Sequence, residues 1–174
     1  MDITDVTVAE VAGRLSGGAG TGRTDSILLQ HWLLRFGSAS GELRLIVGDF
    51  TEWTGNRQPP WAAYMALMSG RLIVLDKQPG IRPFGVRETW QRLVAKCLLW
   101  VTGPEEKAAC GKIQLARVVE AGIEVAIHAM RVLWEEHTQE EEWRFLLVDA
   151  WNAFNEENRA SMLWAVWHKW PSGE

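Results

Sequence analysis

The spacing of apolar side chains changes at residue 71, and this change most constrains the fold. Before it, apolar residues recur every three or four positions between Gly and Pro breaks, a spacing typical of amphipathic helices. Residues 71–77 are instead a continuous β-branched and Leu-rich run, a Gln-Pro-Gly turn follows at 78–80, and residues 81–86 can return as a partner strand. We therefore predict a β-hairpin over residues 71–86 in a chain that is otherwise mostly helical.

Four short helices are predicted before the hairpin. Thr7 and Glu10 have the spacing of a capping box, and Asp25 precedes the next helical pattern, which Gly37 is expected to end. The third helix begins at Ser40 or Gly41, and Pro59-Pro60 opens the fourth.

The residues after the hairpin predict more helices and one buried strand. Helices are expected over 88–101, around 105–110 after a break at Gly103-Pro104, over 121–136, and over 156–170 with Asn155 as the cap. The apolar run 143–148 predicts a strand that ends on Asp149. The fold class is thus α+β, with a helical N-terminal segment at 1–70 and a second region at 71–174.

Composition excludes several classes of protein. The 174 residues carry 18 Lys and Arg against 22 Asp and Glu, a net charge of −4, which excludes a strongly basic nucleic-acid-binding domain. Residues 71–99, however, hold six basic and two acidic residues, a local balance of +4. No apolar run approaches the length of a membrane span, and the acidic N-terminus does not fit a secretion signal. Cys97 and Cys110 are the only cysteines and do not have Cys-x-x-Cys spacing, so the sequence suggests neither a disulfide framework nor a zinc site. We therefore expect an intracellular protein, cytoplasmic or nuclear, with reduced thiols.

Two features suggest chemistry by their residue types alone. Residues 17–24 have the spacing of a phosphate-binding loop, although Arg23 stands in place of its Lys, and the loop would need a strand before it. An interhelical linker explains the same glycines. Asp149 would be delivered by its strand to a sheet edge, where a carboxylate can bind a divalent cation or serve as a turn residue. The four histidines show no metal-ligand spacing.

Four blocks in order resemble the reverse transcriptases of retrotransposons, especially the RNA-directed DNA polymerases of non-LTR elements. Lys77 with Arg82-Pro-Phe-Gly-Val86 is similar to the fingers hairpin of that family, and Arg92-Leu-Val-Ala-Lys96 to the helix after it. Gln114 with the Gly122–His128 stretch resembles the next block. Phe145–Asn155 resembles the first palm motif: an apolar strand, an Asp, and an aromatic residue five positions later.

The resemblance implies roles for particular residues. Asp149 would be catalytic and would bind two Mg²⁺ ions, with the Ala150 carbonyl as a further ligand. Arg82 and Lys77 would hold the triphosphate of the incoming dNTP. Phe154 would lie beneath the deoxyribose and exclude a 2′-hydroxyl by its volume. Gln114 would approach the template or nucleotide, whereas Gly122, Glu124 and His128 would organise the palm helix. The partners would be an RNA or DNA template-primer and a dNTP. Each position also has a purely structural alternative. Arg82 and Lys77 would then be part of a solvated hairpin surface, and Phe154 would be a core aromatic residue at the start of a helix.

One departure from the family decides what this chain can do. The later palm motif of the aromatic-x-Asp-Asp type, which carries two further catalytic aspartates, is absent from the sequence. With one of three metal ligands, the chain is expected to be an inactive fragment that holds the fingers and the first palm motif.

Two other classes stay open. A helical protein-interaction module would use Trp164, Trp167 and Trp170 as its partner surface. A nucleotide-binding NTPase would need residues 17–24 at a strand-to-helix junction.

Overall fold

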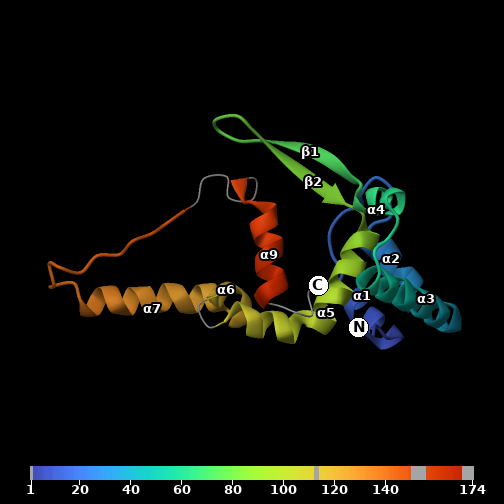
Figure 1. The fold of residues 1–174 in the computed structure, drawn as a ribbon, viewed down its shortest axis with the longest axis horizontal. Helices are drawn as coiled ribbons and strands as arrows, with labels where there is room; N and C mark the ends of the chain where they lie inside the picture. Colours follow the sequence, from blue (N-terminus) through green and yellow to red (C-terminus); the bar gives the residue numbers. More distant parts are fainter. Residues whose placement is uncertain (1, 112–113, 150–155, 170–174) are drawn as a thin grey trace. The chain divides into compact units, whose positions relative to one another are not determined.

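The computed structural model describes residues 2–111, 114–149 and 156–169 (Figure 1). Within this part of the chain the fold is α+β, with eight helices and one two-stranded antiparallel sheet. The chain divides into two compact units, residues 1–101 and 102–174, which are described separately below. In the described residues, no helix combines the length and the apolar character needed to cross a membrane.

Four helices precede the hairpin, as predicted. They are α1 (Asp5–Gly13), α2 (Ser26–Leu34), α3 (Gly37–Asn56) and α4 (Trp61–Met68). The Asp25 side chain caps α2 by accepting a hydrogen bond from the backbone N–H of Leu28 at 2.8 Å. Capping of this kind satisfies a backbone donor that has no partner within the helix.

Three of the predicted helix boundaries are wrong. The cap of α1 is Thr4, whose hydroxyl oxygen accepts from the N–H of Thr7, so the helix begins before the expected capping box. Gly37 does not end α2 but is the first residue of α3, whereas Ser40 lies inside α3 and its hydroxyl donates to the Trp32 carbonyl at 2.7 Å. A local cap thus sets the start of α1, whereas a hydrogen bond between neighbouring helices, which spacing does not reveal, accompanies the early start of α3.

The hydrophobic core lies in the first unit. It joins α1, α2, α3 and the first turns of α5 (Thr89–Cys110) through side chains that are almost fully shielded from water: Val8, Val11, Leu29, Leu33, Val47, Leu93 and Cys97. Burial raises the pKa of the Cys97 thiol to about 11, so this cysteine is an inert packing residue. Cys110 is exposed and is also a free thiol.

The predicted hairpin is confirmed. Strand β1 (Gly70–Asp76) pairs with β2 (Ile81–Arg87), and the tip extends away from the helices of the first unit (Figure 1). In the turn, the N–H of Lys77 donates to the Gly80 carbonyl at 3.0 Å. Gly80 has a φ of +92°, a conformation that favours glycine and explains the residue at this position.

The predicted helix break at Gly103-Pro104 is wrong, because α5 continues through Pro104 to Cys110. An interior proline removes one backbone donor and its ring crowds the carbonyl four residues earlier, at a cost of about 3 kcal/mol, but its fixed φ is a helical value and α5 continues in spite of that cost. The boundary between the two units nevertheless falls just before this dipeptide.

The second unit contains α6 (Leu115–Val118), α7 (Gly122–Glu136) and α9 (Arg159–Lys169). The predicted helix over 121–136 is confirmed. Helix α9 has a later cap than expected: the Asn158 side chain accepts from the N–H groups of Ala160 and Ser161 at 3.0 and 3.2 Å. Asn155, the expected cap, lies outside the described residues.

The predicted strand over 143–148 is wrong. Residues 143–149 have no regular secondary structure, and no other strand of the described chain pairs with them. An apolar run forms a stable strand only when neighbouring strands satisfy its backbone groups, and β1 and β2 pair with each other alone.

Candidate functional site

The tip of the hairpin brings together the two residues expected to hold a triphosphate. Lys77 directly follows β1, and Arg82 is the second residue of β2, opposite Leu75. Both side chains are exposed, and neither forms an ion pair with another residue in the described part of the chain. The tip therefore presents two cations that are available to a phosphate.

One face of the hairpin combines basic and apolar side chains. The register pairs Leu75 with Arg82, Ile73 with Phe84, and Arg71 with Val86, and because side chains alternate along a strand these pairs share a face. Phe84 is exposed, as are Arg71 and Arg82. An exposed aromatic ring between two arginines can stack on a base while the arginines contact phosphates.

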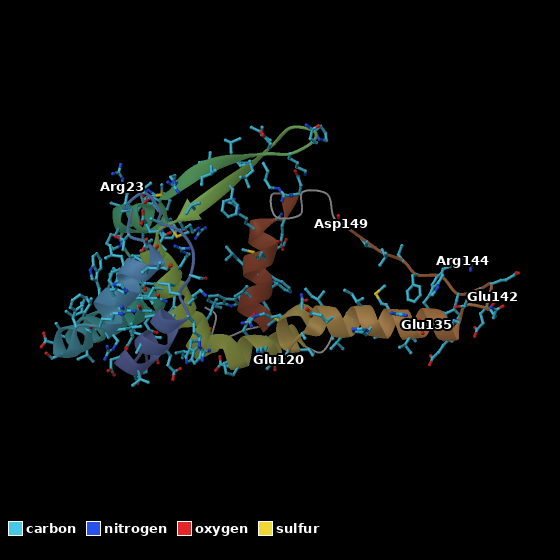
Figure 2. The ribbon with its side chains drawn as sticks, turned by 180° about the vertical axis from the view of Figure 1, so that it is seen from behind. Arg23, Glu120, Glu135, Glu142, Arg144 and Asp149 are labelled. Atoms are coloured by element: carbon cyan, nitrogen blue, oxygen red, sulfur yellow. The ribbon has the colours of Figure 1, made fainter. Side chains whose placement is uncertain are left out.

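Asp149 lies at the exposed end of the irregular segment 143–149, where Figure 2 labels it together with Arg144. The segment begins against α7, since the Phe145 ring packs on Trp134 with their centroids 5.7 Å apart. Beyond Phe145, its side chains are almost fully exposed: Leu146 by 87%, Leu147 by 79% and Val148 by 81%. Among the residues that the structure describes, no strand forms the sheet edge that the sequence predicts for Asp149.

The donor set around Asp149 does not fit a two-ion magnesium site in the described residues. A carboxylate is a suitable ligand for Mg²⁺, but no three His, Cys, Asp or Glu side chains of residues 2–111, 114–149 and 156–169 gather at one point. The other expected contributors, Ala150 and Phe154, lie outside the described residues.

In the block formed by Gln114 and residues 122–128, the structure explains the residue type at Gly122. Gly122 begins α7 where that helix meets α6, and a Cβ there would lie 2.0 Å from the Leu115 carbonyl oxygen. Any larger residue would push the two helices apart. Gln114 is exposed and precedes α6, and Glu124 and His128 are exposed on α7. This supports an organising role for Gly122 alone.

The glycine-rich loop 17–24 joins α1 to α2, so no strand precedes it and the NTPase hypothesis is wrong. The Gly22 N–H and the Thr21 hydroxyl both donate to Glu88 Oε1 at 2.5 Å. A carboxylate of this chain thus occupies the loop amide that a phosphate would need. Arg23, at the position of the phosphate-loop Lys, is exposed on the outside of the unit (Figure 2).

Arg92 forms hydrogen bonds with the start of the same loop. Its guanidinium donates to the Ser16 carbonyl at 3.0 Å and to the Gly18 carbonyl at 2.5 Å. Thr89 adds a third link by donating from its hydroxyl to the Thr24 carbonyl at 2.6 Å. The loop is therefore held to the beginning of α5 at both ends, and Arg92, which belongs to the family resemblance, has a structural role.

The loop contacts give Glu88 a testable pH dependence. Hydrogen bonds from Thr21 and then Gly22 lower the pKa of Glu88, so its ionised form stabilises the fold above its ordinary pKa of 4.5, and this contribution disappears as the pH falls through the lowered value. Comparing thermal midpoints from pH 7 to pH 3, we expect Glu88→Gln to cost stability at neutral pH and the deficit to vanish in acid. Glu10→Gln, at an exposed carboxylate on α1, is the control and should show no such trend. A deficit independent of pH would refute the role of the charge.

Sequence reasoning missed a cavity of about 330 Å³ in the first unit. Apolar side chains from α2, α3, α4 and α5 line most of it: Leu29, Trp32, Leu43, Ala66, Leu67 and Trp90. Thr24, Glu88 and Gln91 add polar groups. The residues come from four separate stretches of the chain, so spacing along the sequence gives no signal of the cavity.

Comparison with known proteins gives no match: no protein-family model, curated protein or solved structure is similar to this chain.

Proposed function

We propose that the chain is part of a retrotransposon reverse transcriptase, with the fingers at β1 and β2 and the first palm motif at residues 145–155. The observation that carries the proposal is the hairpin. It occurs at the block that resembles the fingers, and its tip presents Lys77 and Arg82 without ion-pair partners among the described residues. The complete enzyme would extend a primer on an RNA or DNA template by nucleotidyl transfer, with Mg²⁺ as its cofactor.

The exposed apolar surface of the second unit supports the same proposal. None of the large apolar side chains described in this unit is buried, although Leu146, Leu147 and Val148 form a continuous run. Exposing such a run to water is unfavourable by about 25 cal/mol per Å² of apolar surface. Further palm strands would cover this run and pair its backbone, which would bring Asp149 to a sheet edge. The 174 residues alone are then expected to give no primer extension.

A helical interaction module is the second candidate. It is favoured by α9, where Trp164 and Trp167 are each 60% exposed. Trp170 lies outside the described residues. The two proposals differ at the hairpin, since a module that works through α9 requires no nucleic-acid contact from Lys77 or Arg82.

Nucleic-acid binding by the hairpin provides the experiment. We expect weak binding of a template-primer duplex that falls steeply with salt, because each phosphate contact adds about 0.9 to the slope of log K against log salt. Replacing Lys77 and Arg82 together by Ala should weaken binding and reduce this slope by about 1 to 2, as measured by fluorescence anisotropy between 50 and 200 mM salt.

The matched control is the double variant Arg35→Ala and Arg57→Ala, which removes the same charge from exposed positions at the ends of α2 and α3. This control should change the slope much less. Equal losses in the two double variants would show that net charge, rather than the hairpin, determines binding, and the fingers assignment would be abandoned.

A further inference from the structure

Gln91 is an exception among the buried polar side chains of the first unit. It is 7% exposed, and neither its amide nitrogen nor its amide oxygen has a hydrogen-bond partner. Because both ends of the amide are unpaired, exchanging the nitrogen and oxygen positions does not resolve the deficit. A buried amide without protein partners is unfavourable, so a polar molecule in the adjoining cavity that paired with both ends of the amide would be favoured.

The cavity gives this amide a place to find a partner. Gln91 lines it together with the indole rings of Trp32 and Trp90. Trp32 is exposed, and the cavity is open to solvent. The terminal torsion of a glutamine is soft, and a small rotation can turn its amide toward a molecule in the cavity. The volume of about 330 Å³ lies at the lower end of the range for small-molecule sites.

The lining defines the chemistry of the occupant. Indole rings and leucines favour a flat, apolar ring system, and a glutamine amide offers one donor and one acceptor side by side. Glu88 also lines the cavity, and its carboxylate disfavours an anion. We propose that this cavity binds an uncharged purine nucleoside or base, with Gln91 making a paired contact to the amino group and adjacent ring nitrogen of adenine. This inference does not rest on the proposed polymerase function.

Calorimetric titration of the 174-residue protein with adenosine tests the proposal. Adenosine should bind, and N6,N6-dimethyladenosine, which lacks the amino donors, should bind at least about tenfold more weakly. AMP should bind no more tightly than adenosine because of Glu88. No heat of binding with adenosine at millimolar concentration, equal affinity for the dimethyl compound, or tighter binding of AMP would each overturn the assignment.

Gln91→Leu separates a binding role from a structural one. Leucine has a similar size and removes the unpaired amide, so the variant should keep or raise the thermal midpoint while adenosine affinity falls at least about tenfold. Gln58→Leu makes the same change at an exposed position outside the cavity and should leave affinity unchanged. Undiminished adenosine binding by Gln91→Leu would overturn the proposal, and if that variant failed to fold, the comparison of the two nucleosides on the unmodified protein would still decide.

Discussion

Replacing Leu93 by Ala is expected to lower the free energy of unfolding of the first unit by about 2–5 kcal/mol. Leu93 has no exposed surface and packs in the cluster that joins α1, α2, α3 and α5. The truncation removes apolar contacts and leaves a cavity that the surrounding helices fill only in part. For a domain of this size, whose stability is typically 5–15 kcal/mol, such a loss is a large fraction of the total. Urea unfolding followed by circular dichroism would measure it.

Leu99→Ala is the matched control, because Leu99 lies on the same helix and is 47% exposed. It should cost well under half as much as Leu93→Ala. Similar losses at the two positions would contradict the placement of α5 in the core of the first unit.

The hairpin could be predicted from sequence because its determinants are local. A β-branched run, a Gln-Pro-Gly turn and a returning strand all lie within residues 71–86, and Gly80 supplies the turn conformation. The helix over 121–136 could be predicted for the same reason, because the spacing of its apolar residues is a local feature of the sequence.

The errors arose where distant contacts decide the structure. The strand predicted at 143–148 depends on neighbouring strands that the described chain does not provide. The break predicted at Pro104 is an error of a different kind, because it concerns the local cost of an interior proline, which α5 accommodates. The loop at residues 17–24 has the spacing of a phosphate site, but Glu88 and Arg92 hold it from more than 60 residues away.

The candidate site was predictable to a similar extent. Lys77 and Arg82 come together because a tight turn joins them, and this proximity follows from the sequence. The surroundings of Asp149 do not, because they require residues distant in the chain or outside the described part. The Gln91 cavity is assembled from four separate stretches of the chain and gives no signal in the sequence pattern.

Asp149 carries the largest effect that the polymerase proposal predicts. The polymerase proposal expects a longer reading frame with an aromatic-x-Asp-Asp motif within about a domain's length after codon 174, roughly 100–200 residues, and the test uses the protein of that frame. In that protein, Asp149→Asn keeps the shape of the side chain and removes the charge assigned to the magnesium ions. Primer extension should fall by about three orders of magnitude or more, while the thermal midpoint barely changes, since Asp149 is exposed.

Primer extension by the longer protein and its Asp149→Asn variant, measured with Mg²⁺, template-primer and dNTPs, therefore tests the polymerase proposal most directly. Asp76→Asn, at an exposed carboxylate in the hairpin, serves as the control for loss of one negative charge and should leave the rate within a few-fold of the unmodified protein. The proposal predicts Mg²⁺-dependent extension that Asp149→Asn abolishes and Asp76→Asn does not. Full extension by Asp149→Asn, or none by the unmodified longer protein, would contradict the proposal and leave Asp149 as a turn residue in a helical interaction module.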